Sequence, residues 1–348
     1  MPNVSFLLPV YNGARYLAET LDSLMAQDYP DFDIVAVDDG SADETPDILE
    51  AYAADHPRLR ILRKPNGGLV DALNHGLADL DCAYVARIDA DDICFPNRLS
   101  LQLDFMAFTG AAAVSGKSLH MDEVGNVQAI SASHDIFDAD PHWLPAMEPY
   151  LPHPFLFARL DVLEALGYRH AHLAEDADLC WRLAEHWPIA MQGAVLGQYR
   201  IHTDSISTSS LTSARVQAFF SQLAALNARR RMAGKTEVPY DVDMDTAKAA
   251  GERWEALMAL YADRISTAEA AHLRAGSLLK LLDLARWRGY QPTAGDITAA
   301  AQAIRHLREM PEENREQALK LITDIAPVDD ATPIRGFGGR LRGFLGLY

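Results

Sequence analysis

The stretch that decides the fold of this chain is Ala83-Tyr84-Val85-Ala86-Arg87-Ile88-Asp89-Ala90-Asp91-Asp92, where an apolar run leads into three acidic residues. The run 83–86 predicts a buried strand, and Pro96 lies where a following helix would begin. Asp89 and Asp91 are two residues apart, so they point to the same side while the chain stays extended. Carboxylates held this close repel each other unless a cation neutralises them, and Mg²⁺ and Mn²⁺ prefer oxygen ligands. The stretch therefore predicts a strand that ends in either a divalent metal site or a solvated acidic turn.

The composition is that of an ordinary globular protein, with 348 residues of which 49% are hydrophobic and 23% charged. This length suits two domains, or one large domain with an extension. The formal net charge of −18 argues against a nucleic-acid partner, which needs a basic face. Three scattered cysteines form no zinc or disulfide pattern and suit a reducing compartment. Because we find neither a signal-peptide pattern nor an apolar run of about 20 residues, we expect a cytoplasmic protein.

Short apolar runs alternate with amphipathic stretches through the first ninety residues. Strands are predicted at 4–10, 33–37, 59–62 and 83–88. Helices are predicted at 15–27 and 68–77, and after Ser41, which would form a capping box with Glu44. Strands separated by helices pair in parallel, and ligands bind at the carboxyl ends of such strands. One crevice is therefore expected to collect Tyr11-Asn12-Gly13, Asp38-Asp39-Gly40, Asn66-Gly67-Gly68 and Asp89-Ala90-Asp91.

The remainder of the chain is irregular to about residue 210 and then strongly helical. Residues 110–154 predict long loops around a site, helices follow Leu160 and cover 176–185, and 198–202 predicts a short closing strand. We expect an α/β domain at 1–210, a helical domain at 211–332 and a basic, apolar tail at 333–348. The tail has three interpretations: contact with an anionic membrane surface, disorder, or docking against the protein itself.

Polar residues at the predicted strand and helix ends can each be interpreted in two ways. Asp39 can accept hydrogen bonds from a base or a ribose, or it can belong to a helix cap. The free N–H groups of 66–68 can face an anion, or form a plain strand-to-helix turn. Asp176, beside Glu175 at a helix start, can accept a proton or simply cap the helix. His202 can bind a metal or a phosphate, or make a structural hydrogen bond.

The order of these pieces resembles that of the bacterial family 2 glycosyltransferases, which have the GT-A fold. The resemblance covers about residues 1–205 and implies a Rossmann-like mixed sheet flanked by helices, followed here by an all-helical C-terminal region. Six motifs in register carry it: Pro9-Val10-Tyr11-Asn12, Asp38-Asp39-Gly40-Ser41, Asn66-Gly67-Gly68 with Asn74-His75-Gly76, Asp89-Ala90-Asp91-Asp92 followed by Pro96 and Arg98-Leu99, Glu175-Asp176, and Tyr199-Arg200-Ile201-His202.

The resemblance also implies which residues bind the sugar donor. Asp89 and Asp91 would hold Mn²⁺ or Mg²⁺ against the diphosphate, with Asp91 the direct ligand and Asp89 nearer the ribose. His202 would approach the metal or the leaving diphosphate. The nucleotide part would lie against Pro9, Tyr11, Asn12, Asp39 and Asn66.

The implied catalytic residue is Asp176, as the general base that deprotonates the acceptor hydroxyl, with Arg87 and His153 as further polar site residues. The implied activity is inverting transfer from a nucleotide-diphosphate sugar, with UDP-sugars favoured. Its acceptor would be a glycan or a lipid-linked molecule in bacterial surface polysaccharide or glycolipid synthesis. Peripheral contact with the inner face of the membrane through 333–348, and a homo-oligomer, are left open.

Two other functions are compatible with an α/β half that binds a metal. A nucleotidyltransferase that makes sugar nucleotides normally begins with a glycine-rich loop containing basic residues, whereas this chain has Tyr11-Asn12-Gly13-Ala14-Arg15. A non-catalytic protein that binds nucleotide sugars would need no base at Asp176. Both alternatives are therefore less favoured than glycosyl transfer.

Overall fold

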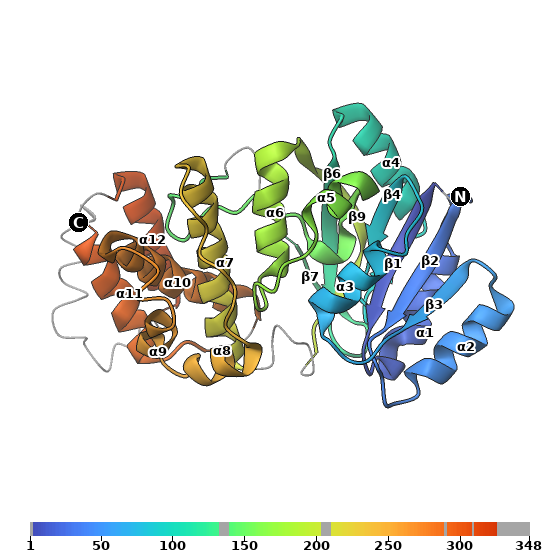
Figure 1. Ribbon diagram of the computed structural model, residues 1–348, viewed down its shortest axis with the longest axis horizontal. Coiled ribbons are helices and arrows are strands. Elements are labelled where there is room, and N and C mark those ends of the chain that lie inside the picture. The colour runs from blue at the N-terminus through green and yellow to red at the C-terminus, as the bar shows by residue number, and fades with distance from the viewer. Residues whose placement is uncertain (1–2, 132–138, 203–209, 289–290, 308–309, 326–348) are drawn as a thin grey trace.

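The computed structural model describes residues 3–131, 139–202, 210–288, 291–307 and 310–325. The sheet and its helices lie at one end of an elongated molecule, and a group of helices lies at the other (Figure 1). The predicted tail 333–348 lies outside the described residues. Among the described helices, none is both long and apolar enough to cross a membrane.

Within the described residues, one mixed sheet of nine strands has the order β3-β2-β1-β4-β8-β6-β9-β5, and β7 pairs with β6 outside this path. The strands β3, β2, β1 and β4 are parallel, and β8 runs antiparallel to β4 and β6. The four predicted strands are therefore confirmed as one parallel half. The strands are β1 (Val4–Val10), β2 (Phe32–Asp38), β3 (Leu59–Arg63), β4 (Tyr84–Arg87), β5 (Ile93–Cys94), β6 (Ala113–Met121), β7 (Val127–Ile130), β8 (Phe157–Arg159) and β9 (Ile189–Arg200).

Helices cover both faces of this sheet. Phe6 and Leu8 of β1 pack into one core with Leu17 and Leu21 of α1, while Leu7 belongs to a second core on the other face. Alternate residues of a strand point to opposite faces, so a strand buried on both sides is apolar throughout. The covering helices are α1 (Ala14–Met25), α2 (Thr45–Asp55), α3 (Leu69–Leu77), α4 (Arg98–Thr109), α5 (Leu160–Leu166) and α6 (Glu175–His186).

Three local predictions are wrong. Ser41 does not cap a helix, because α2 begins at Thr45 with Pro46 in its first turn, and the Ser41 hydroxyl accepts a hydrogen bond from Asn12 instead. The segment 110–154 is not only loops, since it contains β6 and β7. The closing strand is β9, which begins at Ile189 and ends at Arg200, two residues before His202.

The part after residue 210 is helical, as predicted, and its helices share one core. The sequence there repeats apolar residues at helical spacing, and Phe219, Phe220, Tyr261 and Leu278 are completely buried. Helix α6 of the sheet-bearing part lies beside α7 (Figure 1). The division into domains near residue 210 stays a prediction. The helices are α7 (Leu211–Met232), α8 (Met244–Ala250), α9 (Trp254–Ala259), α10 (Thr267–Arg288), α11 (Ala294–His306) and α12 (Glu312–Ile325).

Candidate functional site

The loops that follow β1 and β2 are tied to each other. Asn12 has a positive φ of 49°, a conformation that asparagine tolerates better than most residues. Its backbone N–H donates to the Ser41 hydroxyl at 2.9 Å, and its side-chain oxygen accepts from the N–H of Ala42 at 2.8 Å. Pro9 is buried within β1, whereas the Tyr11 ring is 54% exposed beyond the strand end. Of the residues predicted to touch a nucleotide in this segment, Tyr11 and Asn12 are exposed and Pro9 is not.

Asp39 is surrounded by donors from the loop between β3 and α3. Its Oδ1 accepts from Lys64 Nζ at 2.6 Å and from the N–H of Gly67 at 3.0 Å. Its Oδ2 accepts from the N–H of Gly68 at 2.7 Å and from Asn66 Nδ2 at 3.3 Å. Burial lowers the pKa of Lys64, but the hydrogen bonds that Lys64 donates to Asp39 and Asp71 outweigh this effect and raise the pKa above its usual value. The anion that the start of α3 was predicted to face is therefore the Asp39 carboxylate of the chain itself.

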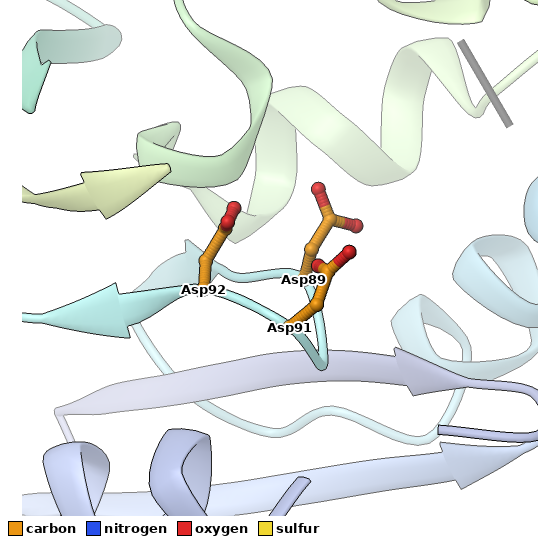
Figure 2. Close-up of side chains that lie close together, drawn as sticks. All are labelled: Asp89, Asp91 and Asp92. Carbon is orange, nitrogen blue, oxygen red and sulfur yellow. The ribbon is translucent and has the colours of Figure 1, made fainter. Parts of the chain in front are cut away.

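Asp89, Asp91 and Asp92 form a cluster on the loop between β4 and β5. Figure 2 shows their three side chains rising from this loop toward the same side. Each offers one carboxylate oxygen, and these oxygens lie within 4.8 Å of one another. The loop is not extended, because the N–H of Asp92 donates to the carbonyl of Asp89 at 3.3 Å and closes a turn. The carboxylates therefore meet, but through a turn rather than through the predicted strand geometry.

Basic residues of β4 and at the end of β9 contact this cluster. Arg87, only 2% exposed, binds both oxygens of Asp89 at 2.5 Å through its two terminal nitrogens. His202 Nε2 lies 2.8 Å from Asp91 Oδ2. Arg200 donates its N–H to Asp92 Oδ1 at 2.8 Å and its Nε to the carbonyl of Asp91 at 2.9 Å. The structure thus brings together all three residues that were predicted to bind a metal, Asp89, Asp91 and His202.

The cluster still has more negative charge than its neighbours satisfy. Burial raises the pKa of Asp92 well above its usual value, and the charges of Asp91 and Asp89 raise it further. Burial and Asp91 also raise the pKa of Asp89, against the opposing effect of Arg87. Asp92 Oδ2 is buried and has no hydrogen-bond partner among the described residues. Three close carboxylates with an unsatisfied buried oxygen are a donor set that fits a hard divalent cation such as Mn²⁺ or Mg²⁺.

Asp176 lies in the first turn of α6 and reaches the same region. Its Oδ1 accepts from the N–H of Ala177 at 2.8 Å, but the N-cap position of α6 is Ala174, so Asp176 does not cap the helix. Burial raises the pKa of the neighbouring Glu175 to about 7, and the charge of Asp176 contributes. The charge of Asp176 also raises the pKa of Asp89, so the start of α6 lies within electrostatic range of the acidic loop. An acid that can accept a proton therefore lies close to the cluster that can hold a cation.

His153 has a structural environment beside Arg87. It is 5% exposed, its Nε2 lies 2.9 Å from the hydroxyl of Tyr168, and burial lowers its pKa well below its usual value, with a further contribution from Arg87. Asn74 fixes the backbone of Tyr168 by accepting its N–H at 2.8 Å and donating to its carbonyl at 2.9 Å. These contacts favour a neutral His153 that supports the site.

Sequence reasoning missed three residues that hold the site together. Asp92 and Arg200 lie inside motifs that the sequence singles out, but their roles depend on contacts between β9 and the acidic loop. Lys64 belongs to no motif. The position of Asp92 just after a predicted strand could have placed it near the site, whereas no pattern in the sequence pairs Lys64 with Asp39.

The family model described as "Glycosyl transferase family 2" matches residues 5–167. Among curated relatives, the uncharacterized glycosyltransferase RP339 of Rickettsia prowazekii is 39% identical over 105 residues, 30% of this chain and 32% of that protein. The putative glycosyltransferase EpsE of Bacillus subtilis is 38% identical over 107 residues, 30% of this chain and 38% of that protein. A chondroitin synthase of Escherichia coli is 32% identical over 128 residues, 36% of this chain and 19% of that protein. The chain thus matches only part of each relative.

Two solved structures resemble the fold over most of this chain. The mannosyltransferase PcManGT from Pyrobaculum calidifontis, in complex with GDP-Man and Mn²⁺, has a TM-score of 0.52 at 19% identity and covers 93% of this chain and 88% of its own. S. aureus TarS 1-349, in complex with UDP-GlcNAc, has a TM-score of 0.51 at 17% identity, with 92% and 88% covered. The predicted fold class, a GT-A sheet flanked by helices and followed by a helical region, is confirmed.

Proposed function

We propose that this chain, whose residues 5–167 match the model of glycosyl transferase family 2, belongs to that family and transfers a sugar from a nucleotide-diphosphate sugar to an acceptor hydroxyl. The observation that supports this proposal is the Asp89-Asp91-Asp92 cluster, whose carboxylate oxygens lie within 4.8 Å of one another, with Asp176 within electrostatic range of Asp89. The donor complexes of the two similar structures, with UDP-GlcNAc and with GDP-Man, support a nucleotide sugar as the donor. We favour a UDP-sugar, and a glycan or lipid-linked acceptor in surface polysaccharide or glycolipid synthesis.

The acidic loop would serve the leaving group. Asp91, Asp89 and His202 would hold Mn²⁺ or Mg²⁺, whose charge would stabilise the diphosphate as the bond to the sugar breaks. Arg87 fixes both oxygens of Asp89, and Arg200 fixes the main chain of Asp91. These arginines hold the carboxylates in place before a substrate arrives, so little reorganisation is needed during the reaction.

Asp176 would act on the acceptor. The dipole of α6 stabilises its anionic form, which is the form that accepts a proton. As the acceptor oxygen forms its bond to the anomeric carbon, its proton moves to Asp176, and the bond to the nucleotide diphosphate breaks. A single displacement of this kind inverts the configuration at that carbon. Tyr11, Asn12 and Asn66 would border the nucleotide part of the donor.

Calorimetry with UDP tests the donor and metal assignments together. We expect much tighter binding of UDP in Mn²⁺ than in EDTA, and we expect Asp91→Asn to abolish the difference. Asp104→Asn, at an exposed position of α4, is the matched control and keeps the difference. Equal affinity in Mn²⁺ and EDTA would exclude a metal that links the loop to the diphosphate, and GDP in parallel distinguishes the two donor classes.

Hydrolysis of a donor sugar with water as acceptor tests the base. Asp176→Asn should leave UDP affinity nearly unchanged and lower turnover by roughly 10²-fold or more, the scale for losing a general base. Glu164→Gln, exposed on α5, is the control. If Asp176→Asn turns over at the wild-type rate, another residue is the base. Binding without any hydrolysis by the wild type would favour a nucleotide-sugar-binding protein, and pyrophosphate release from a nucleoside triphosphate and a sugar phosphate would favour a nucleotidyltransferase.

A further inference from the structure

The segment 139–151, which leads into the site at His153, is anchored by the helical part of the molecule. The N–H of Leu144 donates to Asn314 Oδ1 at 3.1 Å, and Asn314 Nδ2 donates back to the Leu144 carbonyl at 2.8 Å. The N–H of Ala146 donates to Gln222 Oε1 at 2.9 Å. Buried backbone groups must find such partners, and here α7 and α12 supply them. The conformation of this segment therefore depends on the helical part.

The first turn of α6 also packs against the helical part. Ala174 and Ala177, which flank the Glu175-Asp176 pair, are 0% and 3% exposed. They belong to the same core as Phe219 of α7 and Leu278 of α10. Side chains in a close-packed core have little freedom to move. The position of Asp176 is therefore set by packing against α7 and α10.

A buried ion pair joins these two features. Lys280 of α10 lies with its Nζ 3.1 Å from Glu148 Oε2, and the two side chains are 16% and 8% exposed. The hydroxyl of Ser221 donates to the other oxygen of Glu148. Burial lowers the pKa of Lys280, but the charges of Glu148, Asp283 and Asp176 more than compensate and raise it. Lys280 is thus a retained cation that lies within electrostatic range of Asp176.

A buried ion pair gains little stability over a well-packed apolar pair, because both ions lose their hydration. Packing alone therefore does not explain a Lys–Glu pair at this point of the molecule. The charges around Lys280 explain the pair better. Glu148 comes from the anchored segment, Asp176 from α6, and Asp283 from α10 itself. A single cation among three carboxylates lowers their mutual repulsion, and this adds to the hydrogen bonds and the core packing that hold the segment and α6 in place.

We propose that Lys280 is a positioning residue for the acceptor side of the site, and that its ion pair with Glu148 holds the segment 139–151 beside Asp176. This inference rests on the proposed function, in which Asp176 accepts the proton of the acceptor hydroxyl. It gives the helical part a role in the reaction, because α10 then fixes the position of the segment relative to the base.

The main test replaces the ion pair by a neutral pair of similar shape, Lys280→Met with Glu148→Gln, so that no buried charge is left alone. We expect donor hydrolysis to fall by about 10- to 100-fold, because a displacement of about 1 Å at a reacting group can cost about 100-fold. The dissociation constant of UDP in Mn²⁺ and the melting temperature should stay near their wild-type values. A loss in turnover without a loss in nucleotide binding separates positioning of the base from damage to the donor site.

The control is Arg230→Met with Glu269→Gln, which removes the ion pair between α7 and α10 at 3.0 Å with exposures of 15% and 11%. Its other partners, Lys235 and Ser266, lie in the helical part. We expect this variant to keep wild-type turnover. Lys280→Arg retains the charge and should keep most of the turnover that the neutral pair loses.

Three results would overturn the inference: wild-type turnover in the neutral pair, an equal loss in the control pair, or a Lys280→Arg variant as slow as the neutral pair. If the neutral pair does not fold, the comparison of Lys280→Arg with the control pair decides alone. A wild-type protein that neither binds UDP nor hydrolyses a nucleotide sugar would overturn the proposed function first, and that result is seen before any variant is made.

Discussion

Asp39 and the Asp89-Asp91-Asp92 cluster both follow parallel strands of the same sheet, yet their surroundings differ. Asp39 is 2% exposed, and each of its oxygens accepts hydrogen bonds from the loop before α3. In the cluster, Asp92 Oδ2 has no partner within the described chain, and the pKa of Asp92 is raised by burial and by its acidic neighbours. An acidic residue at a strand end therefore does not by itself mark a ligand site. The number of donors that the fold supplies decides whether the carboxylate is already satisfied or still needs a cation.

This comparison also bears on the predicted role of Asp39. Direct contact between Asp39 and a base or ribose stays a prediction, and it would require the carboxylate to exchange one of its present partners for the ligand. The interpretation that agrees with the observed contacts is that Asp39 holds Asn66, Gly67 and Gly68 at the edge of the nucleotide side.

The largest expected effect on stability is that of Asp39→Ala. Removing this carboxylate leaves two backbone N–H groups without their acceptor and leaves Lys64 with only Asp71 and the Pro65 carbonyl, which should cost about 3 kcal/mol of unfolding free energy. Asp71→Ala is the matched control, since Asp71 pairs with the same Lys64 Nζ at 2.6 Å but is 52% exposed. Its removal should cost less than about 1 kcal/mol. Urea unfolding of both variants measures the difference, and equal losses would mean that Asp39 is not the anchor of its loop.

A smaller effect is expected from pH at the acidic edge. Burial and the charge of Asp176 raise the pKa of Glu175 to about 7, above its usual value of 4.5. The folded state therefore holds a proton that the unfolded state releases, and the stability due to Glu175 is lost as pH rises from about 4.5 to 7. Glu175→Gln cannot titrate, so its stability relative to the wild type should grow by about 2 kcal/mol between pH 5 and pH 8.

Urea unfolding at the two pH values, in EDTA, measures this change. Glu164→Gln, exposed on α5, controls for the chemistry of the substitution. If Glu175→Gln and the wild type differ in stability by the same amount at pH 5 and pH 8, the pKa of Glu175 is not raised. Glu175 would then have more hydrogen-bond donors than its contacts indicate.

The parallel half of the sheet could be predicted from sequence because its signal is local. Seven successive buried residues in β1, and similar runs in β2 and β4, are visible as apolar runs between amphipathic helices. The strand β6 could not be predicted, because its sequence mixes Ser, Gly, Lys and His. Its place depends on the distant β9: a Cβ at Gly116 would lie 2.7 Å from Leu196 Cδ1, so the close approach of the two strands needs a glycine there.

The candidate site divides in the same way. Asp89, Asp91 and His202 could be named from motifs, and the structure brings them together, although their metal-binding roles stay predictions. The roles of Lys64 and Lys280 could not be predicted, because each depends on an acidic partner that is distant in the sequence. Long-range ion pairs of this kind follow from packing, for which the sequence carries no local pattern.

The smallest expected effect is a gain, from Asp92→Asn in the absence of metal. Asp92 is completely buried, and its Oδ1 accepts the N–H of Arg200, a contact that an asparagine oxygen can keep. Without metal, Asp92 must either carry a buried charge that Asp89 and Asp91 repel or take up a proton on folding, and asparagine avoids both costs, so unfolding free energy in EDTA should rise by about 1 kcal/mol. In Mn²⁺ the order should reverse, because the variant offers the cation less negative charge and gains less from binding it. Thermal unfolding of the wild type, Asp92→Asn and the exposed control Asp104→Asn, with EDTA and with Mn²⁺, measures both signs. A loss of stability in EDTA would mean that the Asp92 carboxylate, like that of Asp39, already has enough hydrogen-bond donors. The difference between Asp39 and the cluster would then not hold for Asp92.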